Sequence, residues 1–106
     1  MARIVFKKKG TSMSVEVNGE ATMQYAIKAK EYFLSVVNGE CTDCTVDLKK
    51  TDGIDMSFLE LLLSFRKTMI QKNKKIEFVQ LPNDHIFMKY LSRTGIRTDF
   101  LFGKRG

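Results

Sequence analysis

The residue types that most often do chemistry are few in this chain. Cys41 and Cys44 form its one Cys-x-x-Cys pair, and its one histidine, His85, lies far along the sequence. A structural zinc site usually takes four ligands, commonly from two such pairs, and a reactive cysteine pair usually opens a helix. Because Cys44 instead opens a short stretch typical of a strand, we predict two reduced thiols, with Cys44 partly buried, and no metal.

The carboxylates and hydroxyls also fail to form a catalytic pattern. Asp47 falls inside a predicted strand, whereas Asp43, Asp52 and Asp55 fall in turns, where aspartate is common. The chain contains no Gly-x-Ser-x-Gly motif and no glycine-rich phosphate loop, and His85 has no paired nucleophile. The sequence therefore predicts a protein that is not an enzyme and needs no cofactor.

The candidate functional surface is the loop Asp55-Met56-Ser57-Phe58, which joins a short apolar stretch to an amphipathic helix. In open α/β sheets, ligands and partners dock where a strand ends and the next helix begins. We expect partner binding at Asp55, Met56, Ser57, Phe58 and Glu60.

Two residues of this surface have alternative roles. Ser57 and Glu60 form a Ser-x-x-Glu capping box, in which Ser57 is the N-cap of the helix. A phosphate on Ser57 would also be stabilised by the free amides of the helix start, so phosphorylation of Ser57 is the alternative. Phe58 is either an aromatic anchor for a partner or a core residue beneath the helix.

The hydrophobic periodicity predicts the order β-β-α-β-α-β-α-β. Turns are expected at 8–11 and 51–53, Asn18-Gly19 is expected to end the second strand, and Asn38-Gly39 to end the first helix in a left-handed conformation. Asn83 or Asp84 should cap the third helix. The expected strands are 3–6, 13–17, 44–48, 75–79 and 99–102, and the expected helices are 22–37, 57–72 and 86–92.

The two longer helices each show an apolar face that should pack against the sheet. In the first helix the face comprises Met23, Ala26, Ile27, Leu34 and Val37, widened by Tyr25, Tyr32 and Phe33. In the second helix it comprises Leu59, Leu62, Leu63, Phe65, Met69 and Ile70. The strand at 44–48, with a helix on either side of it in sequence, should be a central parallel strand.

Size and composition favour one globular domain over residues 1–106. The 106 residues are 43% hydrophobic and 28% charged, with no linker-like segment. No apolar run is long enough to span a membrane and no signal peptide is evident, so we expect a cytoplasmic protein without membrane insertion. The net charge of +6 arises from lysines at predicted connectors, and without a recognised motif it does not predict nucleic-acid binding.

Several segments, in order, resemble the STAS domain of bacterial anti-sigma factor antagonists, over about residues 12–102. Val46-Asp47-Leu48 resembles the strand of this family that precedes its functional loop. The segment Ile54-Asp55-Met56-Ser57-Phe58-Leu59-Glu60-Leu61-Leu62 resembles that loop and the leucine-rich helix after it. Gly19-Glu20-Ala21-Thr22 resembles the segment before the first helix of the family. Leu91-Ser92-Arg93-Thr94-Gly95-Ile96 resembles the end of its third helix. Residues 103–106 would be a flexible tail.

The resemblance implies a mixed β-sheet with an N-terminal β-hairpin, and about three to four helices mainly on one face. It also implies regulation by docking to an anti-sigma factor or kinase-like protein, with phosphorylation directly after the loop aspartate. In this chain that position is Met56, which cannot accept phosphate, and Phe58 replaces a small glycine.

The resemblance leaves alternative functions open. Related domains are subunits of phospholipid-transport complexes or act in chemotaxis-type signalling. A third alternative is binding of a nucleotide or another small ligand at the same loop.

Overall fold

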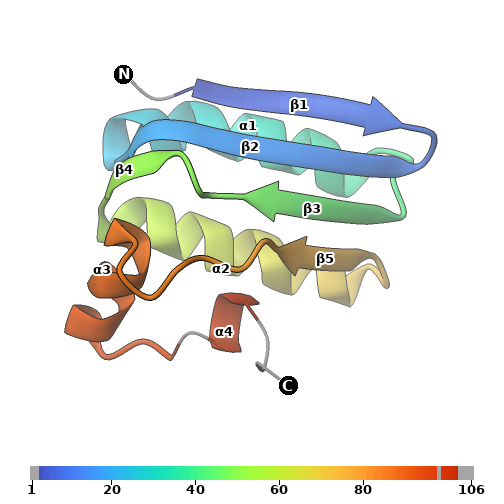
Figure 1. Ribbon diagram of the computed structural model, residues 1–106. Coiled ribbons are helices and arrows are strands. Elements are labelled where there is room, and N and C mark those ends of the chain that lie inside the picture. Colours follow the sequence, from blue (N-terminus) through green and yellow to red (C-terminus); the bar gives the residue numbers. More distant parts are fainter. Residues whose placement is uncertain (1–2, 98, 103–106) are drawn as a thin grey trace.

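A computed structural model describes residues 3–97 and 99–102. Its strands are β1 (Arg3–Lys9), β2 (Ser12–Ala21), β3 (Asp43–Asp47), β4 (Thr51–Ile54) and β5 (Lys75–Phe78). Its helices are α1 (Met23–Asn38), α2 (Met56–Gln71), α3 (Ile86–Thr94) and the one-turn α4 (Asp99–Phe102). Figure 1 shows the sheet in front of α1 and α2, with α3 and α4 beyond its β5 side.

The five strands form one mixed sheet in the order β1-β2-β3-β5. β1 and β2 form the predicted antiparallel hairpin, and β3 lies between β2 and β5 and is parallel to both. The prediction of a central parallel strand is therefore confirmed. β4 pairs in parallel with the end of β2, so β2 has two successive partners on one side.

Alternation along the strands separates a buried face from a polar one. Val15, Val46 and Phe78 are buried beneath the helices, and neighbouring positions of the same strands carry polar residues on the uncovered face. On that face Ser14, Thr45 and Glu77 lie side by side on β2, β3 and β5. The fold is thus the predicted mixed sheet with an N-terminal hairpin and helices mainly on one face.

Two local predictions about the strands were wrong. Residues 51–53 belong to strand β4, and Asn18-Gly19 does not end β2. At Gly19 the backbone has a φ of 84°, and the register with β4 shifts between Gly19 and Glu20. The glycine therefore makes a bulge within the strand, which lets β2 continue from β3 to β4.

The expected last strand at 99–102 is instead helix α4. Leu101 and Phe102 are both buried, and the Phe102 ring contacts Phe78 and Phe87 edge to face, at centroid distances of 6.2 Å and 6.1 Å. A strand would send two successive side chains to opposite faces, whereas a helical turn brings both against the core. The predicted tail, residues 103–106, lies outside the described residues.

The buried face of α1 also differs from the prediction. Ala29, Phe33, Val36 and Val37 are buried, while Met23, Ile27 and Leu34 are exposed. Gly39 does end the helix, but with a φ of −84° rather than in the left-handed region. A Cβ at Gly39 would lie 2.9 Å from the Ser35 carbonyl oxygen, which is the reason a glycine fits there.

None of the helices in the described part of the chain is both long and apolar enough to cross a membrane.

Candidate functional site

Asp55 joins the starts of two helices. Its Oδ1 accepts a hydrogen bond from the Phe58 amide at 3.0 Å, and its Oδ2 accepts one from the Met23 amide at 2.6 Å. The first bond makes Asp55 the N-cap of α2, and the second satisfies an amide at the first residue of α1. One carboxylate therefore fixes both helix starts at the end of β4 and neutralises part of their positive dipole ends.

The predicted capping box at Ser57 and Glu60 is wrong because Asp55 is the cap. Ser57 lies inside the first turn of α2 and is half-buried, and Glu60 is exposed one turn further on. Within the described part of the chain, no hydrogen bond engages the Ser57 hydroxyl. Ser57 is thus free of the structural role that the sequence predicted.

Met56 and Phe58 differ sharply in exposure. Met56, the first residue of α2, is 39% exposed, whereas Phe58 is fully buried in the core. Of the two roles considered for Phe58, the structure supports the core role, and its ring offers no contact area to a partner in this conformation. Of the predicted site residues, Met56 and Glu60 are therefore exposed, while Asp55 and Ser57 are half-buried.

A shallow apolar groove runs between α1 and α2, away from this loop. The Phe33 and Phe65 rings stack across its base with centroids 4.4 Å apart. Its lining includes a single charged residue, Lys30. The groove is lined by Lys30, Phe33, Leu34, Val37, Leu61, Ser64, Phe65 and Thr68.

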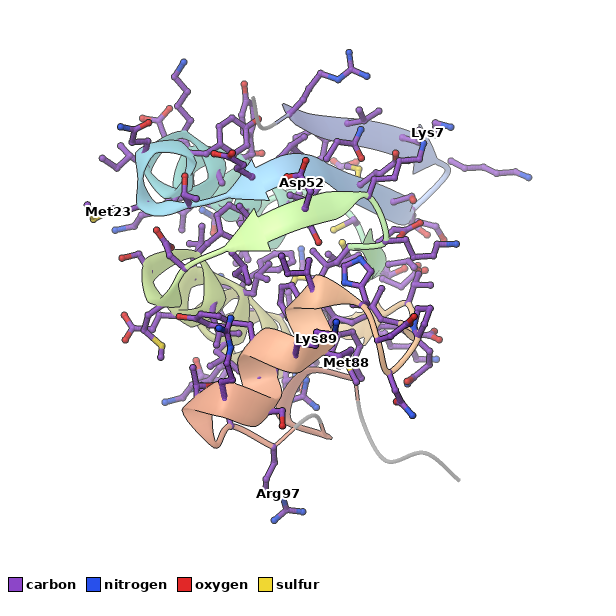
Figure 2. All side chains as sticks on the ribbon, turned by 60° about the vertical axis from the view of Figure 1, so that its left-hand side comes forward. Lys7, Met23, Asp52, Met88, Lys89 and Arg97 are labelled. Carbon is purple, nitrogen blue, oxygen red and sulfur yellow. The ribbon has the colours of Figure 1, made fainter. Side chains whose placement is uncertain are left out.

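Exposed apolar residues of α1 extend this surface. Met23, Ile27 and Leu34 recur at helical spacing on one stripe with Lys30, and Ile27 is 73% exposed. Figure 2 shows Met23 projecting into solvent at the start of α1. Three parts make up what we call the docking surface: the residues Met56, Ser57 and Glu60, the stripe Met23, Ile27 and Leu34, and the groove between α1 and α2.

Sequence reasoning missed the α1 part of this surface for an identifiable reason. The spacing of Met23, Ile27 and Leu34 is that of an apolar face, which predicts burial in the core. However, Ala29, Phe33 and Val36 form a second apolar stripe on the same helix, and only one side of α1 can face the sheet. Two apolar stripes on one helix were the available signal for an exposed surface.

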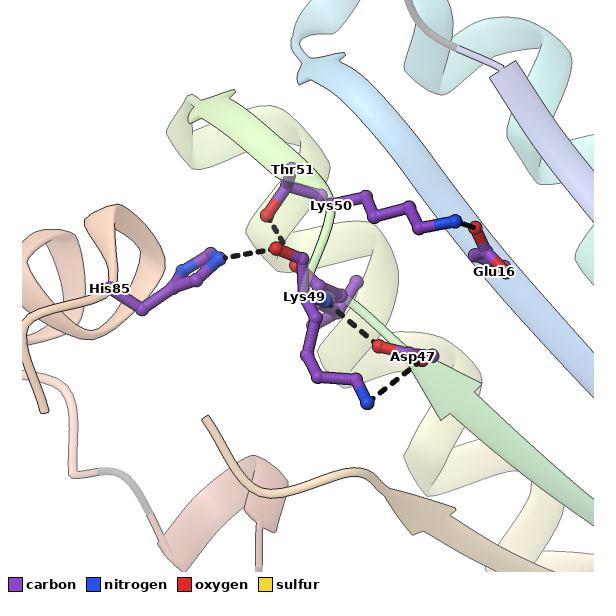
Figure 3. Close-up of polar contacts among 7 residues, drawn as sticks. Glu16, Asp47, Lys49, Lys50, Thr51 and His85 are labelled. Carbon is purple, nitrogen blue, oxygen red and sulfur yellow. Dashed lines mark hydrogen bonds and ion pairs between the residues drawn. The ribbon is translucent and has the colours of Figure 1, made fainter. Parts of the chain in front are cut away.

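A second polar cluster holds α3 against the β3–β4 connection (Figure 3). His85 is the N-cap of α3: its Nδ1 accepts from the Phe87 amide at 3.0 Å, while its Nε2 lies 3.0 Å from the Lys49 carbonyl oxygen. With Nδ1 accepting from the Phe87 amide, Nε2 is the ring nitrogen that donates to the Lys49 carbonyl oxygen. His85 is therefore a structural link, and the predicted caps Asn83 and Asp84 are wrong.

Charged residues beside this connection are paired locally. Lys50 Nζ lies 3.0 Å from Glu16 Oε1, and Lys49 Nζ lies 3.7 Å from Asp47 Oδ2. The hydrogen bond from Lys50 holds the pKa of the Glu16 carboxyl below its usual value. These are ion pairs at the surface of the sheet, and they contribute little to stability.

Both cysteines are free thiols and both are buried. The Cys41 thiol donates to the Val36 carbonyl oxygen at 3.2 Å, and burial raises the pKa of the Cys44 thiol to about 12. Over the residues that the structure describes, no group of three or more His, Cys, Asp or Glu residues could hold a metal ion.

Comparison with known proteins gives structural matches only. No protein-family model matches the chain, and no curated protein matches its sequence. An anti-sigma factor antagonist from Mycobacterium paratuberculosis is similar at a TM-score of 0.78 and 17% identity, covering 98% of this chain and 87% of that chain. The fold is therefore that of the anti-sigma factor antagonists, the STAS fold.

Two further solved structures match the fold. The anti-sigma factor antagonist SpoIIAA in its unphosphorylated form matches with a TM-score of 0.69 and 9% identity, over 100% of this chain and 90% of that chain. The protein named Mglu matches with a TM-score of 0.66 and 13% identity over 77% of this chain. The chain covers only 20% of the length of Mglu. At such identities the likeness establishes the fold, which the sequence resemblance had predicted.

Proposed function

We propose that this protein is a non-enzymatic regulatory domain that binds a protein partner through the docking surface. The observation that carries the proposal is the junction at Asp55, which fixes the starts of α1 and α2 side by side and leaves Met56 exposed between them. An apolar surface with a rigid backbone loses little conformational entropy on binding. Such a surface suits a partner that binds the starts of α1 and α2 without changing their conformation.

The partner class rests on the fold. The matching structures include proteins described as anti-sigma factor antagonists, so the proposed partner is an anti-sigma factor or a kinase-like protein. Docking takes place without phosphorylation at Met56, because a thioether has no group that accepts phosphate. Ser57 is the remaining candidate for modification at this junction, and a phosphate there would meet the first-turn amides of α2.

Affinity capture with matched surface variants tests this proposal. Met56→Glu places a charge within the docking surface and should reduce recovery of the partner by at least about tenfold. Ile70→Glu is the control, because Ile70 is also an exposed apolar residue of α2 but lies near its other end. Equal losses for the two variants, or no loss for either, would contradict the proposed surface.

The identity of the captured protein decides between the two partner classes. Recovery of a kinase-like anti-sigma factor that depends on Met56 supports the proposal. Recovery of a transport ATPase that depends on Met56 would instead support the alternative of a subunit in a membrane-transport complex. Mass spectrometry of phosphopeptides after incubation with a recovered kinase then tests Ser57, with Ser57→Ala as the control.

A further inference from the structure

The outer edge of strand β1 is unpaired. β1 pairs only with β2, and it lies at the end of the sheet order. Figure 1 shows β1 as the outermost strand, with α1 behind it and no described segment along its outer side. Seven residues of extended backbone, Arg3–Lys9, therefore present a sheet edge.

The register shows which backbone groups face outward. Lys9 and Ser12 close the two-residue turn of the hairpin, so the backbone groups of Lys9, Lys7 and Val5 point toward β2. Those of Lys8, Phe6 and Ile4 then point away from the sheet. The Ile4 amide confirms this direction, since it donates to the Tyr25 hydroxyl oxygen of α1 at 2.9 Å rather than to β2.

Tyr25 thus occupies the Ile4 amide at the start of the edge and leaves the amides of Phe6 and Lys8 available. Among the described residues no backbone partner pairs with either of these two amides from the outer side. A strand laid along β1 could take hydrogen bonds from both without displacing any contact of the fold.

Aromatic side chains flank the free part of the edge on the helix side. The Phe6 and Tyr32 rings are in contact, with centroids 5.3 Å apart and a tilted arrangement. Tyr32 is 46% exposed, and it stands at the side of α1 that faces β1. Every second side chain of an added strand would contact these two rings, and apolar side chains would fit this contact best.

The charge on β1 is entirely positive. Arg3, Lys7, Lys8 and Lys9 are all exposed, and β1 has no acidic residue. Lys7 points outward from the strand in Figure 2. The nearby acid on β2, Glu16, forms its ion pair with Lys50 and is also attracted to Lys7, so one acid faces the four cations of β1.

These charges also argue against a second copy of the chain as the occupant. Two β1 edges paired antiparallel about a two-fold axis would place lysines of one copy opposite cations of the other. Like charges directly opposite destabilise a pair of strands. The same lysines that discourage self-pairing would attract an acidic strand.

We propose that the outer edge of β1 binds an extended acidic peptide segment, which adds to the sheet as a further strand through the backbone of Phe6 and Lys8. Apolar residues of the segment lie on the helix side against Phe6 and Tyr32, and acidic residues on the opposite face pair with Lys7 and Lys9. This site is separate from the docking surface, because it lies on the β1 side of α1 and the groove lies on the α2 side.

Amide hydrogen exchange measured by NMR tests the proposal with a synthetic peptide in which glutamate alternates with valine. At a peptide concentration about ten times Kd, exchange at the Phe6 and Lys8 amides should slow by about tenfold. A lysine–valine peptide of the same length is the matched probe and should leave these amides unchanged. Equal protection by both peptides, or protection that misses Phe6 and Lys8, would overturn the proposal.

Substitutions at Lys8 separate backbone pairing from charge attraction. Lys8→Pro removes one outward amide without removing a bond to β2, whereas Lys8→Ala removes only the charge. The proline variant should bind the acidic peptide about tenfold more weakly than the alanine variant, with the spectrum of the folded core unchanged. Indistinguishable binding by the two variants would show an attraction between charges alone and would overturn strand addition.

Discussion

At the residue scale, the carboxylate of Asp55 has the largest identifiable structural role. It accepts from the first turns of both α1 and α2, so two elements separated by a long stretch of chain share one cap. An aspartate at a loop beside a helix start is recognisable in the sequence as a possible cap. Its second acceptor bond, to Met23, depends on how α1 packs against α2.

The double cap predicts a large effect for a loop substitution. Asp55→Ala should lower the free energy of unfolding by about 2 kcal/mol, about 1 kcal/mol for each lost cap. Asp55→Asn keeps one acceptor oxygen and should cost about half as much. Urea denaturation measures both, with Asp52→Ala on the exposed side of β4 as the control, expected to change stability by less than about 0.5 kcal/mol. An equally large loss in the control would contradict the role assigned to Asp55.

Cys44 gives a second prediction at this scale. The thiol is 1% exposed and its pKa is raised from 9.0 to about 12, mainly by burial. At pH 8 the native protein should not react with iodoacetamide at Cys44, while the urea-unfolded protein should react readily, as mass spectrometry would show. Rapid labelling of Cys44 in the native protein would show that the strand opens locally.

The same shift of the Cys44 pKa fixes the direction of a pH effect. A group with a raised pKa in the folded state stabilises the fold below its unfolded pKa, and the contribution is lost as pH rises toward the folded value. The free energy of unfolding should therefore fall between pH 9 and about pH 12. Comparing this slope with the slope measured for Cys44→Ala isolates the contribution of the thiol.

At the element scale, helix α3 is held at both ends by single residues. His85 caps its start and bonds the Lys49 carbonyl of the β3–β4 connection, and Gly95 ends it with a φ of 76°. A glycine suits this position, since a left-handed terminal residue is most easily a glycine. The histidine cap was not predicted, because Asn and Asp are the commoner capping residues and both precede it.

Substitution of His85 should separate its two bonds. His85→Asn can retain the cap and should cost less than about 0.5 kcal/mol from that bond, whereas His85→Ala should lower the free energy of unfolding by about 1 kcal/mol or more. Thermal unfolding compares the stability of the two variants. Hydrogen exchange at the Phe87 amide, which should be faster in His85→Ala than in His85→Asn, reports loss of the cap directly. Equal stability of both variants and the parent would show that the cap does not hold α3.

At the scale of the whole molecule, the chain builds two layers, with helices on one face of the sheet and polar side chains on the other. The one-turn helix α4 completes the core beside β5, with Leu101 and Phe102 buried and Gln80 Nε2 donating to the Phe102 carbonyl oxygen at 2.9 Å. The last described residues are therefore part of the core rather than an appendage to it.

Loss of the Phe102 ring tests this closure. Phe102→Ala removes two edge-to-face aromatic contacts and leaves a cavity beside Phe78 and Phe87, so it should cost about 3 kcal/mol. Ile86→Ala truncates an exposed apolar residue of α3 and should cost much less. Denaturant unfolding of both variants gives the comparison, and a loss below about 1 kcal/mol for Phe102→Ala would mean that α4 is not needed for the core.

Local patterns in the sequence were sufficient for the order of most elements. The hairpin, α1, β3, α2, β5 and α3 each follow from alternation or helical spacing over their own residues, with boundaries off by a few positions. The turn predicted at 51–53 and the strand predicted at 99–102 are wrong because segments of three or four residues hold too little periodicity to distinguish a strand, a turn and a helix. Their conformation is set by what they pair with or pack against, which is β2 for the first segment and the core rings for the second.

The sequence by itself determined the fold class and the position of the Asp55–Phe58 loop between a strand and a helix, because strand alternation, helical spacing and the motif order are properties of neighbouring residues. Only the tertiary structure decided which residues of that loop can be reached. Burial of Phe58, exposure of Met23, Ile27 and Leu34, and the sharing of Asp55 between two helices all depend on how α1 and α2 pack on the sheet. Each helix has more apolar surface than the sheet can cover, so the choice of the buried side is made by packing between elements distant in the chain.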